Sequence, residues 1–242
     1  MKYWDLHKLP LSFIEVAPEN WIRRDTQRLL DIGIPVTLHG VSLNLGGCDP
    51  LDIPFVKSVG RLMDELHIDL YSDHLASSGH QGHLYDLFPV IRIASEAERI
   101  ADRIKTVQDT LGRRIAIENP TTYISLGDIP DHHFLSRVAQ TADCNILLDL
   151  NNIVVNYKNL AEIDPVEYVE SIDRERITYC HVAGHYWNHD LKFYIDSHSR
   201  HPDQITFDLI HRVNKPKLLE WDNNIPDIQV IEEELWKIST HS

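Results

Sequence analysis

The sequence predicts an α/β protein in which strands and helices alternate, as in a TIM-type (β/α) barrel. Short apolar stretches alternate with amphipathic stretches of helical period along nearly the whole chain, which is typical of a parallel sheet covered by helices. A polar residue able to bind a ligand follows nearly every apolar stretch, whereas an open doubly wound sheet concentrates such residues at one switch point. The length of 242 residues suits one barrel, so we expect residues 1–242 to form a single domain.

The first half of the chain contains four predicted strands and three predicted helices. Ile115, Ala116 and Ile117 form an apolar run that is too short for a helix and ends before Pro120, which favours a strand buried on both faces. Gly33 and Gly112 follow helical patterns, where glycine commonly ends a helix. We expect strands at residues 11–18, 34–40, 68–72 and 115–118, and helices at residues 23–32, 54–66 and 95–111.

The second half repeats the pattern with strands at residues 145–149, 177–184 and 217–221, and helices at residues 134–141, 165–172, 207–213 and 228–238. Seven strands are one fewer than a closed eight-stranded barrel has. Either residues 1–10 add an irregular segment, or the barrel lacks its first strand. We expect the glutamates at residues 232–234 on an exposed helix face, and solvated loop positions for His80, His83, His132 and His133.

Composition and charge narrow the class of protein. The chain is 43% hydrophobic and 25% charged, as in ordinary globular proteins. Its net charge of -14 argues against nucleic acid or an anionic membrane as a partner, because both are negative. Cys48, Cys144 and Cys180 are far apart and suggest a reducing compartment. With no signal-peptide pattern and no apolar run of membrane-spanning length, we expect a cytoplasmic protein.

The polar residues near the strand ends carry the predicted chemistry. Around one barrel mouth they would converge on a single cavity. Imidazole and carboxylate together suit iron, zinc or manganese, and there are too many candidates for one ion, so we expect two or three metals. Cys180 precedes His181, but strand alternation turns it away from the mouth. No side chain is predicted as a separate catalytic acid or base. The metal-binding candidates are Glu15, His39, His74, Glu118, Asp149, His181 and Glu220, with Asp196 and His198 as a further pair.

Seven motifs in order resemble the DUF692 (UPF0276) family over residues 13–226. They are Leu38-His39-Gly40, Ser72-Asp73-His74-Leu75, Ile117-Glu118-Asn119-Pro120, Leu148-Asp149-Leu150-Asn151-Asn152, His181-Val-Ala-Gly-His185, Asp196-Ser-His198 and Leu219-Glu220-Trp221-Asp222. This family includes multinuclear non-haem iron-dependent oxidases such as those of methanobactin biosynthesis. The chain departs from it in lacking the usual glycine-rich first strand, and in having Ala17 where relatives often have histidine.

The resemblance implies a xylose-isomerase-like TIM barrel that holds two or three iron ions. Such enzymes use iron and dioxygen to modify cysteines, or residues near them, in ribosomally made peptides. On the family pattern, Glu118 would bridge two metals, with His39 and His74 on the first. Asp149, His181 and Glu220 would hold the second metal. Asp196 and His198, with Asn152 or a neighbouring residue, would hold the third. Glu15, Asn119, Asn151 and His185 would support these ligands.

The resemblance also implies two partners, a Cys-containing precursor peptide and a protein that presents it. Because a barrel without its first strand has exposed edges, a second subunit could cover them in a homo-oligomer. Two other functions remain open. One is a metal-dependent phosphodiesterase or sugar isomerase of the endonuclease IV or xylose isomerase type, with zinc or manganese in place of iron. The other is a degenerate, non-catalytic barrel that serves as a binding protein.

Overall fold

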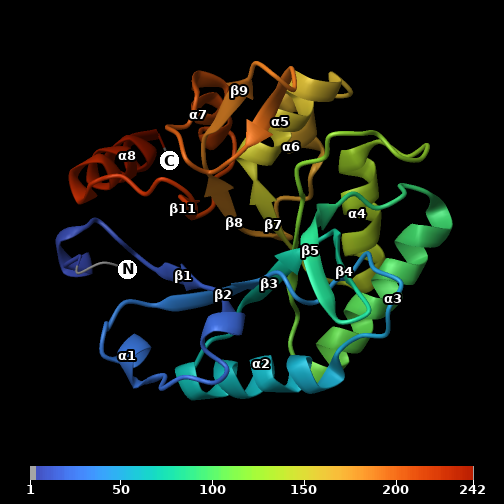
Figure 1. Cartoon of the computed structure of the whole chain (residues 1–242), viewed down its shortest axis with the longest axis horizontal. Coiled ribbons are helices and arrows are strands. Elements are labelled where there is room, and N and C mark those ends of the chain that lie inside the picture. Colours follow the sequence, from blue (N-terminus) through green and yellow to red (C-terminus); the bar gives the residue numbers. More distant parts are fainter. Residues whose placement is uncertain (1–3, 242) are drawn as a thin grey trace.

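The computed structural model describes residues 4–241, and its centre is a curved sheet of seven strands (Figure 1). All neighbouring strands in this sheet are parallel, and their order in space follows their order in the sequence. This confirms the predicted barrel architecture and the predicted number of strands. The strands are β1 (Ile14–Val16), β2 (Val36–Gly40), β3 (Tyr71–His74), β6 (Ala116–Glu118), β7 (Asn145–Asp149), β8 (Ile177–Val182) and β11 (Lys217–Leu219).

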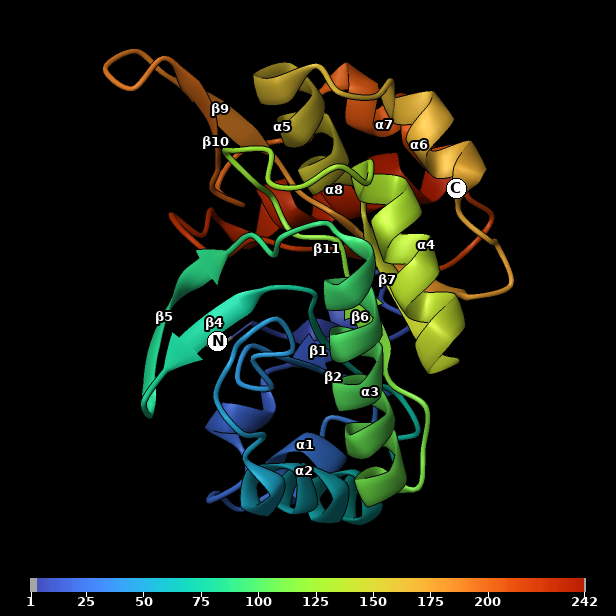
Figure 2. The same ribbon diagram turned by 90° about the vertical axis from the view of Figure 1, so that its right-hand side faces the viewer.

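Helices cover the outside of the sheet (Figures 1 and 2). They are α1 (Gln27–Leu30), α2 (Ile53–Leu66), α3 (Ala94–Leu111), α4 (Asp131–Ala142), α5 (Leu150–Leu160), α6 (Pro165–Ser171), α7 (Gln204–Ile210) and α8 (Ile228–His241), with 3-10 turns η1 (Leu6–Lys8) and η2 (Pro18–Asn20). Gly112 ends α3 in the left-handed conformation, as the sequence predicts. Within the described residues, no helix combines the length and the apolar surface needed to cross a membrane.

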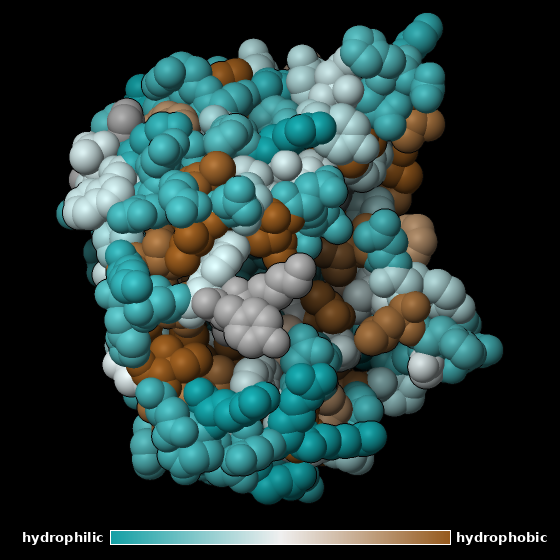
Figure 3. Space-filling view, turned by 60° about the vertical axis from the view of Figure 1, so that its left-hand side comes forward, coloured by the Kyte–Doolittle hydropathy of each residue, from teal (hydrophilic) through white to brown (hydrophobic). Residues whose placement is uncertain are grey.

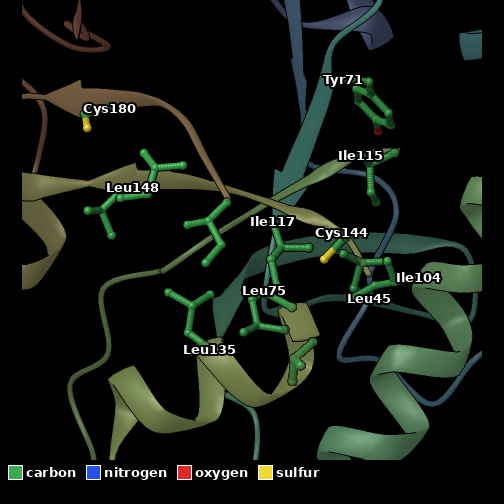
Figure 4. Close-up of a cluster of buried hydrophobic side chains, with 14 of the residues drawn as sticks. Leu45, Tyr71, Leu75, Ile104, Ile115, Ile117, Leu135, Cys144, Leu148 and Cys180 are labelled. Atoms are coloured by element: carbon green, nitrogen blue, oxygen red, sulfur yellow. The ribbon is translucent and has the colours of Figure 1, made fainter. Parts of the chain in front are cut away.

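The hydrophobic core follows the alternation of side chains along each strand. Ile115 and Ile117 point outward and pack with Leu148 of β7 and Leu135 of α4 in the layer between sheet and helices (Figure 4). Cys180 belongs to the same layer, which confirms that it faces away from the mouth. The opposite face of the strands lines the barrel interior, where Ala116, Leu147 and Tyr179 form a separate apolar cluster with Phe13, Leu70 and Leu218. Successive residues of a strand therefore point alternately into the layer between sheet and helices and into the barrel interior.

Several local predictions were wrong. Only residues 27–30 of the helix predicted at residues 23–32 are α-helical. Helix α5 was missed because it starts directly after β7, without a loop, and its first turn contains two buried asparagines. Two antiparallel hairpins were also missed: β4 (Ser77–His80) with β5 (His83–Phe88), and β9 (His185–Asn188) with β10 (Phe193–Asp196).

Two side chains are less exposed than expected. His132 lies in α4 rather than a loop and is buried beside Tyr168. Glu234 is buried as well, because its carboxylate pairs with His201 and Lys237, and so the glutamates of α8 do not form one exposed face. Both errors have the same cause, since a polar side chain was assigned to solvent although a tertiary partner holds it inside.

The barrel has an open seam between its two edge strands, β1 and β11. Among residues 4–241, strand β1 pairs only with β2, and β11 pairs only with β8. One cavity of about 1510 Å³ opens at this seam and continues to the barrel mouth. Figure 3, which views the molecule from the seam side, shows hydrophobic side chains around a hollow. The lining residues from the seam include Phe13, Ile14, Leu218, Leu219, Ile231 and Leu235.

Candidate metal centre

Every strand of the central sheet contributes an acidic or histidine side chain at its carboxyl end, and strand alternation explains why these side chains meet. Glu118 lies two residues after the interior residue Ala116, Asp149 two after Leu147, and His181 two after Tyr179. Residues two apart share a face of a strand, so each polar side chain points into the barrel just above an apolar one. The same spacing holds for the pairs Phe13 and Glu15, Thr37 and His39, Ser72 and His74, and Leu218 and Glu220.

Glu118 lies at the centre of one half of the cluster. Its Oε2 is 3.1 Å from Nε2 of His39 and 3.1 Å from Nε2 of His74, and its Oε1 is 3.4 Å from Nδ1 of His181. The carboxylate is 1% exposed. One buried carboxylate in contact with three imidazoles from three strands could help to hold a cation.

Glu220 connects the other half of the cluster. Its Oε2 is 3.0 Å from Nδ1 of His181 and 2.9 Å from Nδ1 of His198. Nε2 of His198 is in turn 2.8 Å from Oδ1 of Asp196. Oδ2 of Asp149 lies 3.8 Å from His181 and 3.9 Å from His198. The structure thus brings eight of the nine predicted ligands together in one continuous cluster: His39, His74, Glu118, Asp149, His181, Asp196, His198 and Glu220.

Asn152, the ninth predicted ligand, lies beside the cluster and is already hydrogen bonded. Its backbone N–H donates to Asp149, and its side chain accepts from Thr121 and donates to the carbonyl of Asn119. It also lines the cavity. Asn119 joins β6 to β7 by exchanging two hydrogen bonds with the backbone of Asp149. Asn119, which the resemblance implies as a supporting residue, therefore lies against Asp149.

Buried polar atoms without hydrogen-bond partners show that the cluster fits cations. Among the described residues, Oε2 of Glu118, Oδ2 of Asp149, Nδ1 of His181, both ring nitrogens of His198 and Oε2 of Glu220 are buried and make no hydrogen bond. Three sets of ligand atoms lie close enough to share an ion: His39, Glu118 and His181; Glu15, His181 and Glu220; and Asp149, His198 and Glu220.

The hydrogen bonds of the imidazoles leave the nitrogens that face the cluster free to bind. Nδ1 of His74 lies 3.2 Å from the carbonyl oxygen of Gly40, which can only accept, so Nδ1 carries the proton and Nε2 faces Glu118. Nδ1 of His39 contacts the hydroxyl of Ser72 at 3.0 Å. Nε2 of His181 contacts Glu15 at 3.2 Å, which turns Nδ1 towards the other carboxylates. Outer partners of this kind orient metal-binding histidines.

The charges of the cluster perturb the protonation of its members. Burial lowers the pKa of His39, but the charges of Glu118 and Glu15 outweigh it and raise this pKa to about 9. Burial raises the pKa of Glu118, but His74, His39 and His181 outweigh it and hold this pKa well below the usual range. In Asp149, burial dominates and raises the pKa well above the usual range. Protons would hold this cluster together in the place of cations, and bound cations would displace them.

The sequence did not identify the side chains that support the cluster from below. Tyr179 donates a hydrogen bond to Glu15 and contacts Ser72 at 3.1 Å, and Ser72 contacts His39. Strand period contains the signal for both, since Ser72 precedes His74 by two residues and Tyr179 precedes His181 by two. Burial raises the pKa of Cys180 to about 12, so this thiol stays protonated and does not join the site.

An apolar rim surrounds the mouth above the cluster. Phe88 of β5, Phe193 of β10, and Tyr123, Ile124 and Leu191 in nearby loops line the same cavity as His39, Glu118 and Glu220. The rings of Tyr123 and Phe193 are in edge contact, with centroids 6.2 Å apart. An apolar entrance above a buried polar cluster is typical of sites that bind an organic ligand and exclude water.

Comparison with known proteins places the chain among modification enzymes. Residues 2–242 match the model of the RiPP precursor modification enzyme MbnB/TglH/ChrH, where RiPP denotes a ribosomally synthesised and post-translationally modified peptide. A UPF0276 protein of Neisseria meningitidis serogroup B is 37% identical over 249 residues, covering 96% of this chain and 87% of the relative. A UPF0276 protein of Acinetobacter baylyi is 37% identical over 238 residues, covering 94% of this chain and 82% of the relative.

Solved structures with the same fold are xylose-isomerase-like TIM barrels. A D-tagatose 3-epimerase-like protein superposes with a TM-score of 0.65 at 13% identity, covering 97% of this chain and 92% of that protein. A xylose isomerase-like TIM barrel protein of Mycobacterium smegmatis in complex with magnesium gives a TM-score of 0.64 at 10% identity, covering 98% and 86%. At this identity the likeness shows the fold alone.

Proposed function

Because the chain belongs to the RiPP precursor modification enzyme family MbnB/TglH/ChrH, we propose that it is an iron-dependent oxidase that uses dioxygen to modify a cysteine, or a residue near it, in a ribosomally made peptide. The observation that carries the proposal is the buried cluster of histidines and carboxylates whose unpartnered atoms face one another at the barrel mouth. Mixed imidazole and carboxylate ligands suit iron, and also zinc or manganese.

Two or three iron ions would be held by three overlapping groups of residues. His39, His74 and Glu118 would hold the first ion. Asp149, His181 and Glu220 would hold the second, with Glu118 between the two. Asp196 and His198 would hold a third, with Asn152 beside it. Bound iron would supply the redox chemistry with dioxygen that amino acid side chains lack.

The chain itself orients the ligands and excludes water. Glu15, Ser72 and the carbonyl of Gly40 fix the ring nitrogens of His181, His39 and His74, as their hydrogen bonds require. Five residues of the cluster are almost wholly buried, so charges interact there more strongly than in water because the local dielectric constant is low. They are His39, Glu118, Asp149, His181 and His198. We assign no side chain as a separate catalytic acid or base.

The cavity supports a peptide as substrate. Its volume of about 1510 Å³ exceeds the roughly 300–1,000 Å³ of ordinary small-molecule pockets, and its rim is aromatic and aliphatic. The proposal includes a Cys-containing precursor peptide and a protein that presents it, in the cytoplasm, where free thiols persist. It also includes a second copy of the chain over the seam, because within the described part of the chain the outer edges of β1 and β11 are unpaired there.

Metal analysis followed by a single turnover tests this function. Protein loaded with iron(II) without oxygen is mixed with a Cys-containing precursor peptide encoded beside its gene, together with the presenting protein, and then exposed to air. We expect a mass change in the peptide that requires both iron and dioxygen. Glu220→Gln should abolish it, whereas Glu233→Gln on the exposed face of α8 should not.

Other outcomes separate the alternatives. Zinc or manganese in the purified protein, with no oxygen-dependent change in any peptide, would favour a hydrolase or isomerase. A protein that binds none of these metals under any condition would be a binding protein, and the oxidase proposal would be wrong.

A further inference from the structure

We infer that Lys158 is a positioning residue for the cation site formed by Asp196 and His198, acting through His185 and Asn151. The inference rests on the proposed metal centre. Its basis is an unbroken chain of polar contacts: Nζ of Lys158 lies 2.8 Å from Nε2 of His185, Nδ1 of His185 lies 2.7 Å from Oδ1 of Asn151, and Nδ2 of Asn151 lies 2.7 Å from Oδ1 of Asp196.

The ammonium group of Lys158 fixes the direction of every hydrogen bond in this series of contacts from Lys158 to Asp196. An ammonium can only donate, so Nε2 of His185 must accept and its proton must lie on Nδ1. Nδ1 then donates to Oδ1 of Asn151, which leaves the amide Nδ2 to donate to Asp196. The carboxylate of Asp196 thus receives a donor on Oδ1, the oxygen that also lies 2.8 Å from Nε2 of His198.

If these hydrogen bonds ran in the opposite direction, two hydrogen-bond acceptors would face each other. Oδ2 of Asp203 lies 3.5 Å from Nε2 of His185 and could accept a proton from that nitrogen if Lys158 were absent. Nδ1 would then become an acceptor, and the amide of Asn151 would have to turn its NH₂ group towards it. The amide oxygen of Asn151 would then face the carboxylate of Asp196, and these two acceptors would repel each other beside the cation site.

The neighbours of Lys158 hold its ammonium group in place. Oδ2 of Asp203 lies 2.5 Å from Nζ, and the side chain of Lys158 is 19% exposed. Asp203 is itself fixed, because it caps α7 by accepting from the backbone N–H of Thr206. The ring of Tyr194 lies 4.7 Å from Nζ on another side. The chain of contacts therefore joins α5, α7 and the β9–β10 hairpin to the metal centre.

Metal content and the tautomer of His185 test the inference together. We expect the affinity for the most weakly bound iron(II) or manganese(II) ion to be at least about 10-fold lower in Lys158→Met than in the unaltered protein. A loss of this size is usual when an outer partner of a metal ligand is removed. Nitrogen-15 NMR of the metal-free variant should show the proton of His185 on Nε2 instead of Nδ1. Lys158→Arg, which also only donates, should restore both properties.

Two further variants separate positioning from general damage. Lys105→Met removes an exposed ion pair on α3 and should change neither property. Asp203→Asn keeps a capping side chain on α7 but removes the charge that holds Lys158, so it should weaken metal binding in the same direction as Lys158→Met. If Lys158→Met fails to fold, Asp203→Asn decides the question alone.

The possible failures are distinguishable. If the unaltered protein binds no metal, the proposed function fails and the inference fails with it. If the unaltered protein binds several ions, and Lys158→Met and Asp203→Asn bind the same number with the same affinity, then the inference alone is overturned.

Discussion

Glu118 is the carboxylate that His39, His74 and His181 share, and its charge sets the protonation of His39. Its position two residues after Ala116 places it on the interior face of β6 at the level of all three rings. A residue in contact with three possible ligands cannot be replaced without affecting each of them.

We expect Glu118→Gln to weaken metal binding by more than about 10-fold, since even supporting residues of metal sites have effects of that size. In the metal-free variant the pKa of His39 should fall from about 9 towards its usual value, because a charge that raises it is lost. NMR titration of the imidazoles and elemental analysis measure these effects. Glu98→Gln, at an exposed ion pair, is the control.

His132, which lies outside the candidate metal centre, should make the stability of the protein depend on pH. Burial and the charges of His133 and Arg92 lower its pKa from 6.5 to about 4. The unfolded chain therefore binds a proton at a higher pH than the folded chain does, so this residue reduces stability as the pH falls from 6.5 to about 4. In that window, the free energy of unfolding should fall less steeply for His132→Gln than for the unaltered protein. Urea unfolding at a series of pH values measures the difference, and equal slopes would contradict it.

At the scale of elements, Asp149 serves both β7 and α5. It ends β7, and its Oδ1 caps α5 by accepting from the backbone N–H of Asn152, while Oδ2 faces His181 in the candidate metal centre. A strand that passes directly into a helix in this way fixes the direction of the carboxylate.

The two functions of Asp149 can be separated by two substitutions. Asp149→Asn keeps an oxygen that can cap α5 and loses the charge, whereas Asp149→Ala loses both. We expect both variants to bind metal weakly, and the alanine variant to be less stable than the asparagine variant by about 1 kcal/mol in the absence of metal. Denaturant unfolding in chelator measures this, and equal stability would show that the cap contributes nothing.

Strand alternation made most of the fold and the cluster predictable, because apolar runs of period two fix both the strands and the residues at their ends. It could not reveal α5, whose first turn contains Asn151 and Asn152, since buried asparagines resemble a loop until their partners are known. It also could not reveal that Lys158 meets His185, because these residues lie 27 positions apart and only the packing of α5 against the β9–β10 hairpin joins them.

At the scale of the whole molecule, metal binding should stabilise the folded chain. A ligand that binds only the native state adds about 4 kcal/mol at a concentration 1,000 times its Kd. We therefore expect a chelator to lower the melting temperature of the metal-loaded protein. Calorimetry with and without chelator measures the shift, and Glu118→Gln, which lacks the shared ligand, should show a smaller one.

The unpaired edges of β1 and β11 give bound cations a mechanical role as well. Glu15 of β1 and Glu220, which follows β11, both contact His181. Ions bound at that point would therefore link the two edge strands of the barrel across the seam. Amide hydrogens of β1 and β11 should then exchange with solvent more slowly when metal is present than when it is absent. Loss of the ions would loosen the barrel wall at β1 and β11, whose outer edges have no neighbouring strand among the residues that the structure describes. The protein would then lose its metal chemistry and the enclosure of its cavity together.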